Sequence, residues 1–403
     1  MRIAYFSDNF YPALSGIADS IILSARELAR QGHEIRFYVP SYAARDFQRA
    51  QATASAPDFG ERTDVFRLLS IPYPPASEQR RIVIPTGRSY FSLRRWKPDV
   101  IHTQLCFGAG IEALLAARLL HVPMVGTSHT PLASYLHFTP FHGPWVTRKL
   151  LDYVSWYYNQ CAYVTAPSNF MFAEMEEHGF DRPHRAFSNP IDTVLFHAPT
   201  PGTRTALRHE FGITGRAIVY AGRLSPEKHV DTCIQAMPEI RKSVPDAVLL
   251  LAGQGSAQQQ LTDLAARLGV SDAVRFLGFI DQAQLSRVYQ ASDVFVIAST
   301  VETQCLTMMQ AFACGLPTVG VRAGGLPEYL PSSVGFIVPP EDPVALAGKL
   351  AAILSDDEQR RQLGARALHF VQQYSAPRIA AEWAELYSSN SLRNGLRNST
   401  IQR

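Results

Sequence analysis

Short apolar runs alternate with segments of helix length along most of this 403-residue chain. In the first half of the chain the apolar runs are RIAYFS, EIRFYVP, DVIHTQ, PMVGTS and AYVTAPS. Runs of this kind, separated by helix-length stretches, are typical of parallel strands that are buried on both faces. The alternation therefore predicts an α/β protein with doubly wound parallel sheets.

The alternation stops once, in the proline- and threonine-rich stretch NPIDTVLFHAPTPGTRT. It restarts with AIVYAGRL and continues through AVLLLAGQG, VRFLGF, DVFVIAS, PTVGV and GFIVP. A chain of 403 residues is also too long for one ordinary core. We expect two Rossmann-like domains, 1–196 and 197–375, that face each other across a cleft. We expect a helix within 376–392 to cross back to the first domain, and 393–403 to be a frayed polar tail.

Composition narrows the class of protein. Hydrophobic residues make up 46% of the chain and charged residues 18%, as in soluble globular proteins. The net charge of +3 is too small to argue for a nucleic-acid partner. Five cysteines without CxxC spacing indicate reduced thiols, and the start MRIAYFSDNF lacks the pattern of a signal peptide. No apolar run has the length of a membrane span, so we expect a cytoplasmic protein.

Ligands of doubly wound proteins bind where the strands end, so the loops after the predicted strands form the candidate site. In SDNFYPALSGIADS, Gly16 stands before a predicted helix, where the backbone can approach an anion. A plain tight turn also explains this glycine, and the spacing does not match GxGxxG. In YAGRLSPEKHV, Arg223 leaves a strand and Lys228 opens the next predicted helix. Together the two cations suit a diphosphate, although each alone is explained as an ordinary surface charge.

Two further loops complete the candidate site. In VETQCLTMMQAF, residues 303–306 offer backbone N–H groups at the start of a helix predicted over 305–314. Glu302 stands just before them and can accept sugar hydroxyls, or can act as a plain capping charge. In RAGGLPEYL, Gly324 and Gly325 precede another predicted helix. These loops together predict a pocket for a nucleotide-diphosphate sugar.

Several segments now match one family: GRLSPEK, FLGFI, ETQCLTMMQA, AGGLPE and GFIVPPEDP. With them the chain resembles the retaining glycosyltransferases of the GT-B fold, the large group with an E-x7-E motif that includes bacterial mannosyl- and glucosyltransferases. The resemblance covers residues 1–390. It is specific for the fold and the reaction class, and weakly specific for the substrate.

The resemblance implies roles for individual residues. Arg223 and Lys228 would bind the diphosphate, Glu302 the donor sugar, and His129 in GTSHTPLASYLHF would lie near the transferred sugar. A histidine that ends a strand is otherwise often only a hydrogen-bonded structural residue. The resemblance also implies that the backbone of FLGFI reads the base of the nucleotide. It implies these further donor-binding residues: Gly16, Gly278, Phe279, Thr303, Gln304, Cys305, Leu306, Gln310 and Gly325.

The chain departs from the family pattern at two positions. Gln310 stands where the second glutamate of the motif is usual, and Cys305 stands where a small residue is usual. In the family the second glutamate typically binds the ribose hydroxyls. An amide still accepts hydrogen bonds but lacks the charge that roughly doubles their strength. The departure therefore concerns donor affinity and donor identity rather than the chemistry.

No two aspartates lie two positions apart, so the chain has no DxD metal motif. We expect a metal-independent reaction without a cofactor, in which Arg223, Lys228 and helix N-termini stabilise the leaving diphosphate. No carboxylate is clearly placed as a covalent nucleophile. We therefore expect front-face retaining transfer from a UDP- or GDP-sugar, with the diphosphate oxygen accepting the acceptor's proton and His129 orienting the sugar.

The acceptor is suggested by one basic segment. Residues 80–97 carry Arg80, Arg81, Arg88, Arg94, Arg95 and Lys97, interleaved with Tyr90, Phe91, Leu93 and Trp96. A basic helix with aromatic residues can lie on anionic lipid, or it can be a solvated face. We expect a lipid-linked or cell-envelope acceptor and peripheral contact with the inner face of the plasma membrane.

Two rival functions share this fold class. A nucleotide-sugar 2-epimerase would need acids and bases around C2 of the sugar, and the arrangement from GRLSPEK to ETQCL favours a transferase. A catalytically weakened subunit that only binds sugar nucleotides is compatible with Gln310, although Glu302, Arg223, Lys228 and His129 all remain. The nature of the products formed from a sugar nucleotide separates the three.

Overall fold

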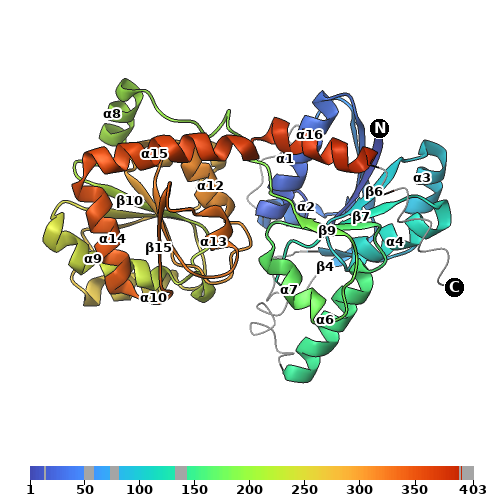
Figure 1. Cartoon of the computed structure of the whole chain (residues 1–403), viewed down its shortest axis with the longest axis horizontal. Helices are drawn as coiled ribbons and strands as arrows, with labels where there is room; N and C mark the ends of the chain where they lie inside the picture. Colours follow the sequence, from blue (N-terminus) through green and yellow to red (C-terminus); the bar gives the residue numbers. More distant parts are fainter. Residues whose placement is uncertain (13–14, 50–58, 73–80, 132–142, 390–391, 393–403) are drawn as a thin grey trace. The chain divides into compact units, whose positions relative to one another are not determined.

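The computed structural model describes residues 1–12, 15–49, 59–72, 81–131, 143–389 and 392. The chain forms two compact units (Figure 1). Unit 1 consists of residues 1–190 and 376–403, and unit 2 consists of residues 191–375.

Unit 1 is built on a parallel sheet of seven strands in the order β3-β2-β1-β6-β7-β8-β9. The sequence predicted the five inner strands, because strands buried on both faces consist of apolar runs. It missed the two edge strands, whose exposed positions break the apolar run, and the short antiparallel hairpin β4–β5. The strands are β1 (Arg2–Phe6), β2 (Glu34–Pro40), β3 (Thr63–Leu68), β4 (Ser70–Pro72), β5 (Arg81–Val83), β6 (Val100–Thr103), β7 (Met124–Thr127), β8 (Tyr163–Ala166) and β9 (His184–Ala186).

The C-terminal helix of the chain belongs to unit 1. It packs along α1 (Figure 1). Tyr387 on this helix forms a 3.0 Å hydrogen bond with Tyr5 of the inner strand β1. Residues 393–403, predicted to be a frayed tail, lie outside the described residues. The helices of unit 1 are α1 (Gly16–Arg30), α2 (Ala44–Arg49), α3 (Ser89–Trp96), α4 (Gly108–Leu120), α6 (Pro144–Tyr158), α7 (Phe170–Glu176) and α16 (Ala376–Ser388).

A buried glutamate fixes the start of α3. Glu112, on α4, accepts hydrogen bonds from the backbone N–H groups of Thr86, Gly87 and Ser89 and from the Ser89 hydroxyl, at 2.7–2.9 Å. In the sequence this residue only interrupts an apolar run. In the fold it satisfies backbone donors at the N-terminus of the neighbouring helix, which would otherwise lack partners.

Unit 2 contains a second parallel sheet, of six strands in the order β12-β11-β10-β13-β14-β15. All six lie where the apolar runs predicted them. The strands are β10 (Ala217–Ala221), β11 (Val248–Ala252), β12 (Val274–Gly278), β13 (Val294–Ile297), β14 (Thr318–Val321) and β15 (Gly335–Val338). The helices are α8 (Pro201–Glu210), η1 (Pro226–Lys228), α9 (Val230–Ser243), α10 (Gln258–Arg267), α11 (Gln282–Ala291), α12 (Leu306–Ala313), α13 (Leu326–Tyr329), α14 (Pro343–Ser355), α15 (Asp357–Val371) and η2 (Gln372–Tyr374).

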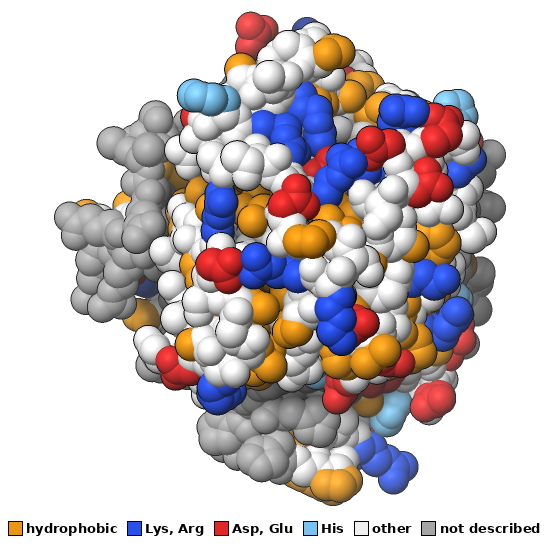
Figure 2. Space-filling view, turned by 90° about the vertical axis from the view of Figure 1, so that its left-hand side faces the viewer, with side chains coloured by type: hydrophobic (Ala, Val, Ile, Leu, Met, Phe, Trp, Pro, Cys, Tyr) orange, Lys and Arg blue, Asp and Glu red, His pale blue; other side chains and the backbone are white. Residues whose placement is uncertain are grey.

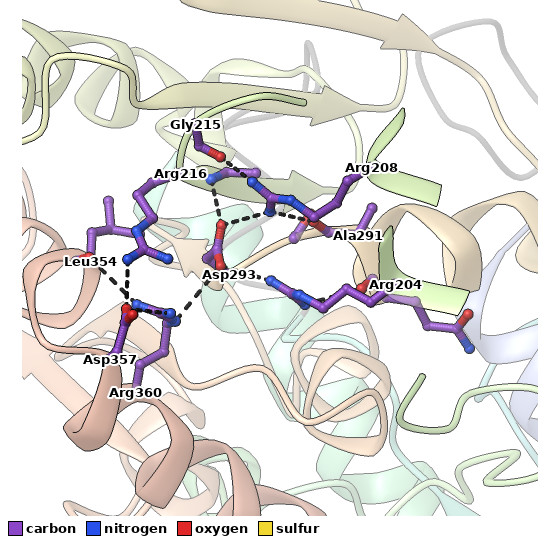
Figure 3. A network of polar contacts seen from close by, with 12 residues as sticks. Arg204, Arg208, Gly215, Arg216, Ala291, Asp293, Leu354, Asp357 and Arg360 are labelled. Carbon is purple, nitrogen blue, oxygen red and sulfur yellow. Dashed lines mark hydrogen bonds and ion pairs between the residues drawn. The ribbon is translucent and has the colours of Figure 1, made fainter. Parts of the chain in front are cut away.

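A buried aspartate ties two helices to this sheet (Figure 3). The carboxylate of Asp293, just before β13, is 1% exposed and lies 2.7 Å from Arg204, 3.1 Å from Arg208 and 3.7 Å from Arg360. It also accepts the backbone N–H of Ala217 at 2.8 Å. Because these arginines stand on α8 and α15, one carboxylate joins both helices to the amino ends of β10 and β13. This cluster lies at the sheet edge opposite to the loops predicted to bind the donor.

On the described part of the face drawn in Figure 2, no large area carries charge of a single sign. Lysine and arginine side chains alternate there with aspartate and glutamate. Such a mixed surface agrees with the small net charge of +3. This face therefore presents no broad basic patch.

Candidate functional site

Three adjacent strands of unit 2 end in glycines with positive φ: Gly222, Gly253 and Gly278, at 149°, 145° and 68°. These glycines allow neighbouring loops to approach closely. A Cβ atom on Gly253 would lie 1.9 Å from the carbonyl oxygen of Gly222, and the Gly253 N–H donates to the Gly278 carbonyl at 2.8 Å. The carboxyl edge of the sheet is therefore lined by backbone, to which a ligand has close access.

Arg223 follows the first of these glycines and is held by an acid that the sequence analysis missed. Its guanidinium lies 3.5 Å from the carboxylate of Glu227, which also accepts a 2.6 Å hydrogen bond from the hydroxyl of Ser225. The signal was present in GRLSPEK, where an acid stands between the two cations. Glu227 is buried, so its carboxylate has a defined position from which it orients Arg223.

Lys228 and Glu302, predicted to bind different parts of the donor, bind each other. Their charged atoms are 2.6 Å apart, and both side chains are largely buried. Burial works to raise the pKa of Glu302. The charge and hydrogen bond of Lys228, together with a hydrogen bond from Ser299 and the charge of Arg223, outweigh burial and hold that pKa below its ordinary value. The prediction that Lys228 opens a helix is wrong: it ends the 3-10 turn η1, and α9 begins at Val230.

The loop before α12 is shaped by its own backbone and by the glycine loop beside it. Cys305 has left-handed backbone angles (φ 61°, ψ 78°), and α12 begins at Leu306 and ends at Ala313, slightly inside the predicted 305–314. The N–H of Gly325 donates to the Glu302 carbonyl at 2.8 Å. A Cβ atom on Gly324 would lie 2.4 Å from that same oxygen. The pair of glycines therefore positions the backbone of Glu302.

The other predicted donor residues of unit 2 lie around the same edge. Thr303 and Leu306 are half-buried and Gln304 is buried, while Phe279, after β12, is 46% exposed. Gln310 lies on α12 and is half-buried. Its Oε1 atom is buried and has no hydrogen-bond partner within the described part of the chain. Among the described residues Oε1 of Gln310 is therefore an unsatisfied acceptor, and a contact of Gln310 with ribose stays a prediction.

In unit 1, Gly16 is the first residue of α1, and the hydroxyl of Ser15 before it accepts the Ala18 N–H. His129, which follows β7, is buried, and its Nε2 lies 2.6 Å from Oε1 of Gln104. Burial lowers the pKa of His129 to about 4, so the imidazole is neutral near pH 7. Sequence reasoning missed Gln104, whose only signal was a polar residue directly after a strand.

The side chains of His129 and Gln104 line a cavity of about 20 Å³, together with Tyr5, His102, Thr127 and Trp383 among others. The structure thus brings Arg223, Glu227, Lys228 and Glu302 together in unit 2 and pairs His129 with Gln104 in unit 1. Across the described ranges, no three His, Cys, Asp or Glu side chains group as metal ligands. All five cysteines are buried free thiols.

The basic segment 80–97 differs from its prediction. Arg81 lies in β5 and is paired with buried Asp46 at 3.2 Å, and Trp96 is buried with Arg36 4.6 Å above its ring. The helix α3 exposes Phe91, Arg94 and Arg95. The prediction of a basic helix with aromatic residues is therefore wrong for Arg81, which lies in a strand, and for Trp96, which is buried. Arg80 lies outside the described residues.

Comparisons with known proteins agree with this architecture. The family described as Glycosyltransferase Family 4 matches residues 14–195, and the family Glycosyl transferases group 1 matches residues 204–370. An alpha-monoglucosyldiacylglycerol synthase of Streptococcus pneumoniae is 26% identical over 324 residues, which are 79% of this chain and 70% of that protein. A GDP-mannose-dependent alpha-mannosyltransferase of Mycolicibacterium smegmatis is 28% identical over 402 residues, 98% of this chain and 100% of that protein.

Among solved structures, HepE from Anabaena in complex with UDP superposes with a TM-score of 0.74 at 19% identity, over 96% of this chain and 99% of that one. This likeness shows the fold, and the two family matches together extend over most of the chain. They confirm the resemblance read from the sequence motifs. The chain belongs to the GT-B glycosyltransferases that use nucleotide sugars, with a Glycosyltransferase Family 4 segment in its first half and a Glycosyl transferases group 1 segment in its second.

Proposed function

We propose that this glycosyltransferase moves a hexosyl unit from a UDP- or GDP-sugar to an acceptor hydroxyl, with retention of configuration and without a metal ion. The observation behind the proposal is the Lys228–Glu302 pair with Arg223 nearby in sequence, at a sheet edge lined by glycine backbone. Lys228 and Arg223 supply positive charge for a diphosphate, and Glu302, kept ionised by Lys228, supplies an acceptor for sugar hydroxyls.

The chemistry follows from what these side chains do. Negative charge develops on the diphosphate as the glycosidic bond breaks, and cations already held in place stabilise it without reorganisation. Glu227 orients Arg223, and Glu302 orients Lys228. In a front-face transfer the departing diphosphate oxygen accepts the proton of the acceptor hydroxyl. His129, neutral at assay pH, then contributes hydrogen bonding rather than charge.

The charge assignment is tested by Arg223→Ala and Lys228→Ala. Removal of one preorganised donor from a developing oxyanion costs about 3 kcal/mol, so kcat/KM should fall about 100-fold in each variant. The matched control is Arg241→Ala, which removes a surface arginine of the same unit that is paired with Asp272 at 2.9 Å. Its kcat/KM should stay near wild type. Near-normal transfer in both site variants would refute the diphosphate assignment.

Donor and mechanism are tested on the purified protein with UDP-glucose, UDP-galactose, GDP-mannose and GDP-glucose. Transfer that gives an α-linked product, or slow hydrolysis that releases the sugar as its α-anomer, supports a retaining transferase. A 2-epimerised sugar nucleotide supports the epimerase alternative. Binding without turnover supports the weakened subunit. Excess EDTA should leave the rate unchanged, and a loss restored only by a divalent ion would refute metal independence.

We also propose a lipid-linked or cell-envelope acceptor reached at the inner face of the plasma membrane. The support is a diacylglycerol-modifying relative and the exposed group Phe91, Arg94 and Arg95 on α3, an apolar ring beside two cations. No helix among the described residues combines the length and the apolar composition needed to cross a bilayer. The contact that we propose is peripheral and is made through this exposed group on α3.

The membrane proposal is tested by co-sedimentation with vesicles that contain phosphatidylglycerol or only phosphatidylcholine. The double variant Arg94→Glu/Arg95→Glu should lose binding to the anionic vesicles. The control Arg241→Glu/Arg361→Glu makes the same change in net charge in unit 2, at one half-buried and one exposed position. Equal binding by both double variants would refute the assignment of α3.

A further inference from the structure

The pairing of His129 with Gln104 has a chemical consequence for the ring of His129. Gln104 follows β6 and His129 follows β7, and these strands are neighbours in the sheet. The N–H of Gln104 donates to the Phe6 carbonyl at 2.9 Å, which fixes its backbone, and its side chain is buried. The Gln104 Oε1 therefore has a defined position 2.6 Å from Nε2 of His129.

An amide oxygen only accepts hydrogen bonds, so the proton of this bond belongs to Nε2 of His129. A neutral imidazole with its proton on Nε2 has its lone pair on Nδ1. Within the described part of the chain, no hydrogen bond occupies this second nitrogen. His129 therefore offers a hydrogen-bond acceptor on the side of the ring that Gln104 does not contact.

The surroundings of His129 keep the ring neutral. Among the described residues that line its cavity, the other titratable groups are Tyr5 and His102. Burial raises the pKa of Tyr5 above its ordinary value, so it stays uncharged. Burial lowers the pKa of His102, and both its ring nitrogens are bonded, to Tyr387 at 2.6 Å and to Thr127 at 2.7 Å. No carboxylate in this lining competes with the Gln104 amide for the His129 proton.

We propose that Gln104 is a positioning residue for glycosyl transfer: it accepts the Nε2 proton of His129 and thereby leaves Nδ1 unprotonated to accept a hydroxyl of the transferred sugar. This inference rests on the proposed role of His129 near that sugar. An amide suits the task better than a carboxylate, because a carboxylate at 104 would favour the protonated ring, which has no lone pair to offer.

Two substitutions at position 104 separate these effects. Gln104→Met keeps the volume but removes the acceptor, so the ring loses its fixed tautomer and kcat should fall about 5-fold, the value of one hydrogen bond. Gln104→Glu keeps an acceptor but adds charge, which should move the acid limb of the kcat/KM–pH profile up by at least about one pH unit. Activity of this variant should be near wild type at about pH 8 and should fall towards pH 5.

Thr127→Val is the matched control. It removes a buried hydrogen bond to the neighbouring His102 and leaves the Gln104–His129 contact in place. Its kcat and pH profile should stay near wild type. The double variant Gln104→Met/His129→Gln should be no slower than His129→Gln alone, because Gln104 acts through His129.

A direct readout comes from imidazole 15N chemical shifts of the protein labelled in histidine, with His129→Gln to identify the signal. Wild type should show a protonated Nε2 and an unprotonated Nδ1, and Gln104→Met should show exchange between tautomers. A protonated Nδ1 in wild type, or an unchanged kcat in Gln104→Met, would overturn the positioning role alone. Full activity of His129→Gln would overturn the proposed role of His129 itself, and the positioning role with it.

Discussion

Oε1 of Gln310 has no hydrogen-bond partner among the described residues, and this predicts a link between stability and donor binding. A buried polar atom without a hydrogen bond costs about 1–3 kcal/mol, because it has lost water and gained nothing. Gln310→Met removes that oxygen from α12 at nearly constant volume and with similar helix propensity. The donor-free variant should therefore unfold at a higher temperature than wild type. For a domain of the size of unit 2, about 1 kcal/mol corresponds to roughly 2–4 °C.

The same substitution should weaken donor binding. If a ribose hydroxyl donates to Oε1 of Gln310, its loss costs about 1 kcal/mol, or roughly a 5-fold rise in donor KM. The ribose does not react, so its contacts are equal in the ground and transition states and kcat should not change. Gln310→Glu should act in the opposite direction and lower KM by a similar factor, because a charged acceptor strengthens the bonds to both hydroxyls.

The assay pairs thermal melting with donor titration, each with and without the nucleoside diphosphate. Gln290→Met is the matched control, since that buried glutamine of unit 2 donates a 3.0 Å hydrogen bond to the His197 carbonyl. The control should melt at a lower temperature with an unchanged donor KM. A lower melting temperature in Gln310→Met would refute the reasoning about the unpaired oxygen. An unchanged KM in Gln310→Met would refute the contact with ribose.

Three further outcomes are expected. Asp293→Ala leaves the half-buried guanidinium groups around it without their carboxylate, so the free energy of unfolding should fall by about 3 kcal/mol in denaturant titration. A loss below about 1 kcal/mol would contradict the clustered arrangement. Gly324→Ala forces a Cβ atom against the Glu302 carbonyl, so kcat/KM should fall at least about 10-fold. In the control Gly348→Ala on α14, the added Cβ meets nothing within 4 Å, so kcat/KM should stay near wild type. His129 titrates at about 4 when folded and near 6.5 when unfolded, so its contribution to stability is complete above pH 6.5 and is lost as the pH falls towards 4. Between pH 4 and pH 6.5 the free energy of unfolding of His129→Gln should depend less steeply on pH than that of wild type, by up to about 1.4 kcal/mol per pH unit. An equal slope in the two proteins would contradict the depressed pKa of His129.

The sequence by itself determined both sheets and the edge at which the donor loops lie. Inner strands of a doubly wound sheet are buried on both faces, so they must be apolar runs, and the loops after them must gather at one edge. This reasoning located β10 to β15 and placed Arg223, Lys228 and Glu302 in loops of one edge. It failed at β3 and β9, because edge strands are partly exposed and their composition resembles that of loops.

The tertiary structure decided which side chains bind each other. Lys228 and Glu302 are 74 positions apart, and Gln104 and His129 are 25 apart, so no local period could pair them. The crossover connections of the parallel sheets bring their loops together. The same holds for Trp96 and Arg81, which local composition assigned to one basic helix. In the fold, Trp96 packs under Arg36 and Arg81 pairs with Asp46. Local sequence fixes how apolar a segment is, while the partner of a buried polar atom depends on chain segments that only the complete fold brings within hydrogen-bond distance.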